Sequence, residues 1–216
     1  MCFTNRNSPR RRTGSERRVF MLALSVGILG FVCLLIYDVN SFTLRWKVLH
    51  AFFALGTGLV AAATLADLSA AVRLGAFSGA GDAVLAGVGV LWLGALVYSL
   101  FFALPFTGTY CAQPQMPRVC DRGVYALCRH PGVLCFLGMY VFLGAAALPS
   151  PLLTHGMVYS FLNFCYVIFQ DLVTFPKTFC NYAAYRKRVP FLIPTRRSLG
   201  MALQTWRQPT DEEGQT

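Results

Sequence analysis

An arginine, a histidine and a proline stand together at Arg129, His130 and Pro131, immediately before a long apolar run. A charged pair at the entry to a membrane segment is unfavourable unless it binds something. Proline suits the first turn of a helix, where it removes no hydrogen bond, so a helix is expected to begin here. The positive end of that helix and the two basic side chains together favour an anion as ligand.

The elements that must position these side chains are apolar helices. Of the 216 residues, 56% are hydrophobic and only 13% are charged, and the mean hydropathy is +0.53. Soluble domains carry about 25% charged residues, so the composition favours an integral membrane protein. Uncharged apolar runs predict five transmembrane helices. They cover 19–37, 48–66, 83–106, 132–148 and 152–170.

The expected fold is an all-α integral membrane bundle of about five transmembrane helices, with a C-terminal helical hairpin and an interfacial helix. Polar and breaker-rich stretches divide the chain around these helices. The expected segments are 1–18, a disordered basic tail; 19–106, three transmembrane helices; 107–131, a cytoplasmic loop with the Arg-His-Pro motif; 132–171, the transmembrane hairpin; 172–200, an interfacial segment; and 201–216, a second tail.

The connection between the last two helices is Pro-Ser-Pro at 149–151, which allows only a tight turn. These helices are therefore expected to form an antiparallel hairpin, with the start of one beside the end of the other. The Arg-His pair then lies on the same membrane face as Gln170 and Asp171. The segment 174–194 returns to that face as well, so polar groups that are distant in the sequence converge at one interface.

Two tyrosines in that segment, Tyr182 and Tyr185, are three residues apart and share one face of a short helix. The basic residues at 186–188 suit the last turn of such a helix, and Pro190 ends it. The tyrosines fit two interpretations, an aromatic belt at the membrane surface or a wall of a ligand site. The sequence leaves both open.

The formal charge of +10 suits either nucleic acid or anionic lipid as partner. In a membrane protein, basic loops face the cytoplasm and its anionic lipids, so nucleic acid is not expected. With five spans, seven of the 19 lysines and arginines lie on the side of the N-terminus and the other twelve on the side of the C-terminus. The count favours a multi-pass protein with its C-terminus and site on the cytoplasmic face. The arginine-rich N-terminal tail argues for the opposite orientation.

Other polar residues have simpler explanations. His155 lies near the hairpin turn, away from the predicted site, and is expected to take no part in catalysis. Asp67 and Asp82 flank predicted spans and are expected to be solvated helix ends. The eight cysteines include no Cys-x-x-Cys pair, so neither a disulfide framework nor a metal site is expected.

Two motifs, separated by the helical hairpin, carry a family resemblance. They are Gly123-x-Tyr125-x-x-x-Arg129-His130-Pro131 and Tyr182-x-x-Tyr185-x-x-x-Val189-Pro190-x-x-Ile193-Pro194. Their order, spacing and membrane context resemble the isoprenylcysteine carboxyl methyltransferases, integral-membrane enzymes that are similar to the phospholipid N-methyltransferases. The resemblance covers about residues 123–194, the C-terminal third of the chain.

The resemblance implies that S-adenosylmethionine is the methyl donor and binds near the cytoplasmic face. The acceptor, a prenylated cysteine or another lipid-like molecule, would enter sideways from the bilayer. Arg129 and Asp171 are the implied catalytic residues, and Arg129 or His130 would meet the carboxylate of the cofactor. The implied cofactor-binding residues are Tyr125, Arg129, His130, Pro131, Gln170, Tyr182 and Tyr185.

The chain departs from the family pattern at several positions. Val133 and Cys135 stand where the family usually has an aromatic residue and a glycine. Gln170 and Asp171 stand where the family carries a Glu-Glu pair at the end of the last span. With only one buried acid at the hairpin, an anionic acceptor is slightly favoured, because an ammonium acceptor must first lose a proton.

Two other functions remain open. Sterol reductases are also similar in this region, which would make the chain a nicotinamide-dependent membrane reductase. The departures from the family pattern suit instead a non-catalytic membrane protein that retains the fold.

Overall fold

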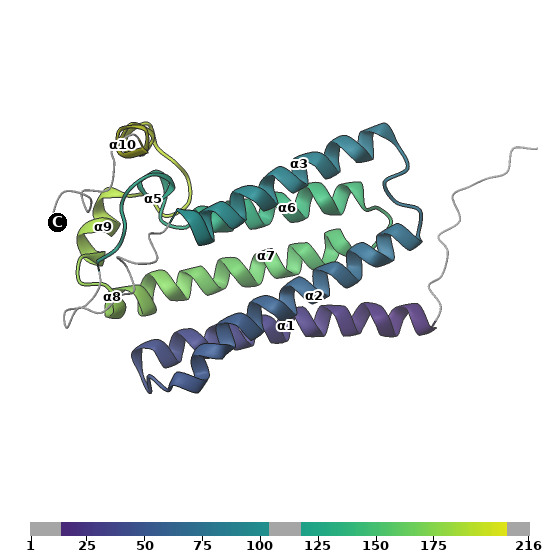
Figure 1. The fold of residues 1–216 in the computed structure, drawn as a ribbon, viewed down its shortest axis with the longest axis horizontal. Helices are drawn as coiled ribbons and strands as arrows, with labels where there is room; N and C mark the ends of the chain where they lie inside the picture. The colour runs from purple at the N-terminus through teal and green to yellow at the C-terminus, as the bar shows by residue number, and fades with distance from the viewer. Residues whose placement is uncertain (1–13, 104–117, 207–216) are drawn as a thin grey trace, which may run out of the picture.

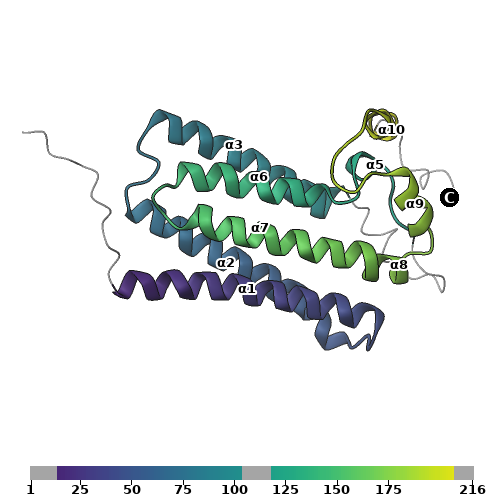
Figure 2. The same ribbon diagram turned by 180° about the vertical axis from the view of Figure 1, so that it is seen from behind.

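The computed structural model describes residues 14–103 and 118–206, and within these two ranges the chain is helical and contains no strand. Its long helices lie side by side as an elongated bundle (Figure 1). They are α1 (Gly14–Phe42), α2 (Ala51–Arg73), α3 (Ala80–Val97), α6 (Pro131–Ala146) and α7 (Leu152–Phe169). The same arrangement is seen from behind in Figure 2.

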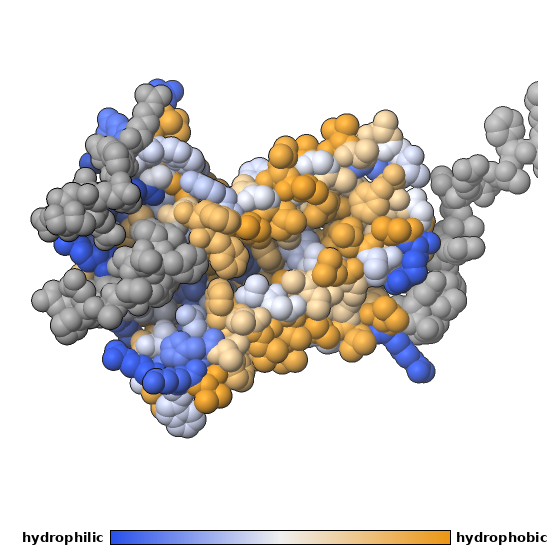
Figure 3. All heavy atoms as spheres, viewed as in Figure 1, coloured by the Kyte–Doolittle hydropathy of each residue, from blue (hydrophilic) through white to orange (hydrophobic). Residues whose placement is uncertain are grey.

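Four segments among the described residues are long and apolar enough to cross a membrane, which suggests a membrane protein. They are Arg18–Phe42, Lys47–Arg73, Ala80–Phe102 and Leu152–Thr178. Helix α6 is apolar but shorter. Figure 3 shows hydrophobic residues over the middle of the bundle and hydrophilic ones gathered at its ends. In water, so many exposed apolar side chains would mark an aggregation-prone surface, whereas lipid solvates them.

Successive long helices run in alternating directions, so the loops fall at two ends of the bundle (Figure 1). We call one the motif end, because both motifs and the short helices lie there. These are α5 (Val124–Leu127), α8 (Phe175–Thr178) and α9 (Tyr182–Arg188), joined by α10 (Arg196–Trp206). We call the other the hairpin end, because it holds the turn between α6 and α7. These two helices pack against each other along the bundle.

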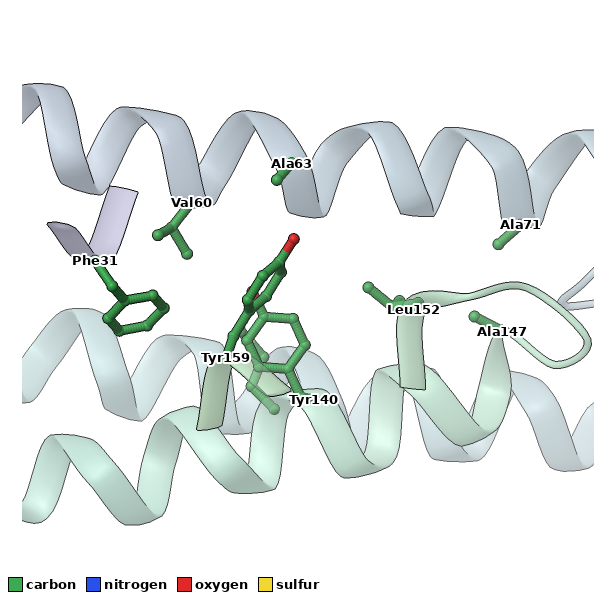
Figure 4. Close-up of a cluster of buried hydrophobic side chains, with 9 residues drawn as sticks. Phe31, Val60, Ala63, Ala71, Tyr140, Ala147, Leu152 and Tyr159 are labelled. Carbon is green, nitrogen blue, oxygen red and sulfur yellow. The ribbon is translucent and has the colours of Figure 1, made fainter. Parts of the chain in front are cut away.

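The core lies where α1, α2, α6 and α7 face one another. Tyr140 and Tyr159 lie side by side near the middle of this cluster (Figure 4), with ring centroids 5.9 Å apart. Helices α1 and α2 approach closely, since a Cβ atom on Gly30 would lie 2.8 Å from the carbonyl oxygen of Gly56. The buried cluster comprises Phe31, Val60, Ala63, Ala71, Met139, Tyr140, Ala147, Leu152 and Tyr159.

Two predicted segment boundaries are wrong. Helix α1 begins at Gly14 rather than at residue 19, and α10 continues the chain in helical form through the boundary at 200/201 to Trp206. A reciprocal cap starts α10: Ser198 N donates to Thr195 Oγ1 (3.1 Å), and Thr195 N donates to Ser198 Oγ (2.9 Å). The rest of both predicted tails, 1–13 and 207–216, lies outside the described residues, as does 104–117 of the predicted loop.

The prediction that Asp67 is a solvated helix end is also wrong. Helix α2 continues six residues beyond it to Arg73, so the carboxylate lies inside the bundle. Its Oδ2 atom is 2.7 Å from Nδ1 of His155, and the two side chains are 3% and 0% exposed. Asp82, by contrast, lies in the first turn of α3 and accepts a hydrogen bond from Gly79 N (3.1 Å).

Candidate functional site

The two sequence motifs are joined by their backbones at the motif end. Arg129 N donates to Pro190 O (2.9 Å), and His130 N donates to Phe191 O (3.3 Å). Helix α6 begins at Pro131, as predicted, so both basic side chains leave the chain just before a helix N-terminus. The extended stretch after α9 therefore fixes the position of the Arg-His pair.

A single carboxylate collects the polar groups of this end. Arg129 Nη1 donates to both oxygens of Asp171, at 2.7 Å and 2.9 Å, and His130 Nε2 is 3.3 Å from Oδ1. Tyr182 donates its hydroxyl proton to the same oxygen. We call Asp171, Arg129, His130 and Tyr182 the Asp171 cluster. The sequence predicted that Arg129, His130, Gln170, Asp171 and the segment 174–194 converge at one face. The hydrogen bonds bring Arg129, His130 and Tyr182 to Asp171.

Asp171 belongs to a widened turn of helix. Residues Gln170–Thr174 form a π-helical segment, η3, between α7 and α8. Pro176 follows, and a proline inside a helix lacks a donor and crowds the carbonyl four residues earlier, at Leu172. A π turn lets the helix continue past such a position, and such turns are frequent at functional sites. The widening turns the Asp171 side chain inward, where it is 4% exposed.

Both predicted tyrosines of α9 are buried, at 2% exposure each, so neither belongs to an aromatic belt. Tyr182 contacts Asp171, while the hydroxyl of Tyr185 donates to the backbone oxygen of Tyr125 (2.7 Å). Burial, followed by the hydrogen bond to Asp171, raises the pKa of Tyr182. Burial, with neighbouring Tyr182 as the next cause, also raises the pKa of Tyr185, so both tyrosines act as neutral donors.

Aromatic rings enclose the Arg-His pair. The His130 ring stacks on Phe175 (centroids 5.7 Å apart) and meets Phe191 edge-on at 5.2 Å. The Arg129 guanidinium lies over the ring of Phe191 at 5.4 Å. Phe175 and Phe191 were not predicted as site residues. Phe191 could have been singled out, because it lies inside the second motif.

Two of the predicted cofactor-binding residues face other helices. The hydroxyl of Tyr125 donates to Ser99 O (2.7 Å), in the π-helical turn Tyr98–Phe102 that follows α3. Gln170 and Tyr166 are both within hydrogen-bonding reach of Asp38 of α1. Pro131 supplies the first turn of α6 and no polar contact. The structure thus separates Tyr125 and Gln170 from the residues that meet at Asp171.

Asp38 is a buried acid that the sequence reasoning missed. Its side chain is within hydrogen-bonding reach of Gln170 and Tyr166, it is 3% exposed, and its Oδ2 atom has no hydrogen-bond partner. The available signal was an isolated acid at the end of the first apolar run. Asp38 lies on α1 rather than on the hairpin, so the prediction of an anionic acceptor, which depends on one buried acid at the hairpin, stays a prediction.

The charges of the cluster are balanced internally. Arg129, the positive end of α6 and more distantly Arg186 (Nε 3.6 Å from Oδ2) all face the Asp171 carboxylate. The anion that the sequence predicts at this helix start is therefore a side chain of the protein itself. Burial raises the pKa of neighbouring Cys128 to about 11, so this thiol is not a nucleophile at neutral pH.

A cavity of about 160 Å³ lies next to the cluster, between α5, α9 and α10. It is lined by Ala126, Val189, Arg122 and Arg188 among others, but by no member of the Asp171 cluster. Ligand pockets commonly measure about 300–1,000 Å³, so this cavity is small for a nucleoside cofactor. Within residues 14–103 and 118–206, no three His, Cys, Asp or Glu side chains are grouped as a metal site would require.

No family model matches this chain, and it has no significant match among curated proteins or solved structures. The resemblance to the methyltransferases therefore depends on the two motifs and on the site that they form.

Proposed function

We propose that this protein is an S-adenosylmethionine-dependent methyltransferase that acts at the membrane on a prenylated cysteine or another lipid-like acceptor. One observation supports this most strongly. The Arg-His pair of the first motif and Tyr182 of the second meet at Asp171, which the hairpin supplies. Three segments that resemble the family only in combination thus build one buried polar centre.

The donor set fits the cofactor. Arg129 Nε is buried and has no hydrogen-bond partner, so the guanidinium keeps a donor for a second carboxylate. The rings of Phe175 and Phe191 offer stacking surfaces beside it. When bound, S-adenosylmethionine supplies an electrophilic methyl group on a sulfonium sulfur.

The residues of the cluster have distinct roles in this proposal. Arg129 and His130 bind the amino-acid part of the cofactor, while Asp171 holds both side chains in place. Because Asp171 is surrounded by donors and almost fully buried, it acts as a positioning residue rather than as a catalytic one. Tyr182 fixes Asp171, and the aromatic rings exclude water from the reacting groups. Methyl transfer is an in-line displacement that depends mainly on such positioning.

The membrane arrangement belongs to the same proposal. Helix α6 has 16 residues, a length of about 24 Å at 1.5 Å per residue, which is short for a hydrocarbon core of about 30 Å. It nevertheless packs between α3 and α7, so we count it as a fifth span. The protein is then a multi-pass membrane protein with its motif end in the cytoplasm, as the count of basic residues favours.

A non-catalytic function has one observation in its favour. The Asp171 cluster is closed, because its basic groups already bind an internal carboxylate and the neighbouring cavity does not reach them. A protein that kept the fold and lost the cofactor would show the same contacts.

Transfer of tritium tests the proposed function directly. The purified protein in lipid is supplied with methyl-tritiated S-adenosylmethionine together with prenylated cysteine or membrane phospholipid and, separately, with a tritiated nicotinamide dinucleotide together with an unsaturated sterol. Tritium from the methyl donor in the lipid fraction supports the proposal, and its loss in Arg129→Ala assigns it to the cluster. Tritium from the nicotinamide alone would instead support the reductase, and no transfer from either would support the non-catalytic function.

A further inference from the structure

Helix α10 carries an apolar stripe that the rest of the described chain leaves largely exposed. Leu199, Leu203 and Trp206 follow one another at spacings of four and three, so they share one face of the helix. They are 50%, 62% and 57% exposed. Three large apolar side chains on one face of an 11-residue helix indicate a surface that contacts something other than water.

The opposite arrangement, a loose helix that could turn this stripe inward, does not fit the contacts. Ser198 and Ala202 are buried, and Thr205 Oγ1 accepts a hydrogen bond from Gly123 N (3.1 Å). Gly123 has φ +55° and ψ −128°, a conformation that favours glycine, so this attachment is built into the first motif. The stripe therefore has a fixed direction relative to the bundle.

That direction is toward the edge of the membrane. The Trp206 ring stacks on Tyr98, with centroids 6.0 Å apart and planes 17° apart. Tyr98 begins the last turn of the candidate span Ala80–Phe102, where aromatic side chains commonly meet the head groups. Figures 1 and 2 both show α10 end-on, so the helix lies across the long axis of the bundle and along the plane of a surrounding bilayer.

Basic side chains flank the stripe. Arg196 and Arg197 occupy the first turn of α10 and are exposed, and Lys187 is exposed on nearby α9. Ile193, 80% exposed in the segment before α10, adds a further apolar side chain. An apolar stripe bordered by arginines is typical of helices that lie in the surface of an anionic bilayer.

We propose that α10 is a membrane-surface anchor, which immerses Leu199, Leu203 and Trp206 at head-group depth and binds anionic phospholipid through Arg196 and Arg197. The net charge of +10 and the flanking arginines select an anionic lipid rather than a basic protein as the occupant. The anchor depends on the membrane placement of the bundle and not on methyl transfer. By holding the loop after α9, it keeps the second motif against the Arg-His pair.

Quenching of Trp206 tests where the stripe lies. The full-length protein with Trp46→Phe and Trp92→Phe is placed in lipid nanodiscs, so that Trp206 is the sole tryptophan. We expect lipids brominated near the head group to quench its fluorescence and aqueous acrylamide to quench it weakly. Strong acrylamide quenching without bromolipid quenching would overturn the proposal. Weak quenching by both reagents would also overturn it, because a second protein copy or a partner would then cover the stripe.

The lipid charge is tested with the same tryptophan. Each basic residue near the surface is expected to enrich anionic lipid about fivefold, so brominated phosphatidylglycerol should quench Trp206 more than brominated phosphatidylcholine at equal mole fraction. Arg196→Gln/Arg197→Gln should abolish the difference. The matched control Arg18→Gln/Arg73→Gln, which removes two exposed arginines from the hairpin end, should leave it unchanged. If both brominated lipids quenched Trp206 equally in the protein that keeps Arg196 and Arg197, the preference for anionic lipid would be contradicted.

Discussion

The bundle contains two buried contacts between a histidine and an aspartate, one at each end. At the hairpin end, His155 Nδ1 lies 2.7 Å from Asp67 Oδ2, and at the motif end, His130 Nε2 lies 3.3 Å from Asp171 Oδ1. By distance and burial alone the hairpin-end pair is the tighter of the two. Its surroundings nevertheless point to a structural function.

The hairpin-end pair joins the interiors of two regular helices, α2 and α7. Phe20 covers the His155 ring at 4.3 Å, and Tyr159 on the next turn donates to Ala23 O. Asp171 instead contacts side chains from a loop, a helix start and a second short helix. Arg129 Nε at the motif end and His155 Nε2 at the hairpin end are both buried without a hydrogen-bond partner, so an unpaired nitrogen does not distinguish the two ends. The difference is that separate segments meet at Asp171, as the proposed binding site requires, whereas the hairpin-end contact joins two packed helices.

The largest expected effect comes from breaking the hairpin-end pair. Asp67→Ala leaves His155 buried without its partner, which should lower the free energy of unfolding by about 3–5 kcal/mol. Thermal unfolding in detergent measures the change. The double variant Asp67→Leu/His155→Leu should regain most of the loss, because apolar side chains of similar volume need no partner. A double variant as unstable as the single one would show that the pair is more than a structural contact.

A smaller effect is expected at the motif end. Arg129→Lys keeps the charge but loses the planar fork that binds Asp171 and the stacking over Phe191. Methyl transfer should fall about tenfold in kcat/KM, roughly 1.4 kcal/mol, with little change in melting temperature. Arg186→Lys is the matched control, because its side chain is 47% exposed and 3.6 Å from Asp171. Equal losses of kcat/KM in Arg129→Lys and Arg186→Lys would contradict a specific role of Arg129.

The hydroxyl of Tyr182 should contribute to stability at the motif end, where Arg129→Lys lowers the rate instead. Tyr182→Phe keeps the ring and removes one hydrogen bond to Asp171, so stability should fall by about 1.5–3 kcal/mol near neutral pH. Because the folded-state pKa of Tyr182 is raised, its contribution is present below the unfolded value of about 10 and is lost as the pH rises further. Unfolding followed from pH 8 to pH 11 should therefore show a shallower alkaline loss in Tyr182→Phe. Parallel curves for the two proteins would contradict the role of this hydroxyl.

The smallest effect concerns how readily reagents reach the cysteine thiols at the motif end. Cys180 is exposed, whereas Cys128, next to Arg129, is 1% exposed and burial raises the pKa of its thiol to about 11. A maleimide at pH 7.5 should therefore label Cys180 at least tenfold faster than Cys128, as peptide mapping by mass spectrometry would show. Comparable rates would mean that the segment before α6 opens readily, unlike the sealed hairpin end.

Much of the fold could be predicted from the apolar runs of the sequence and from one turn, Pro-Ser-Pro at 149–151. The Pro-Ser-Pro connection at 149–151 forces α6 and α7 into a hairpin, which is enough to bring His130 toward Asp171. The partners of Asp67 and Asp38 could not be found in this way. Hydropathy locates the ends of helices but not the faces that pack together, and both acids depend on how α1 and α2 face α7.

Short amphipathic helices were not predicted from the sequence, for a different reason. The 11 residues of α10 are polar on average, and their apolar residues occur at helical spacing rather than as a run. A search for long apolar runs therefore assigned 201–216 to a tail. The π turn that positions Asp171 was equally hidden, because it depends on how the helix accommodates Pro176.

The central claim is that the motif end binds the cofactor and the hairpin end does not. Calorimetric titration of S-adenosylhomocysteine into the purified protein, in detergent and in lipid, tests it most directly. We predict micromolar binding that Arg129→Ala abolishes and that folded His155→Asn retains. No binding to the wild-type protein in either medium would contradict the claim, as would binding that survives Arg129→Ala.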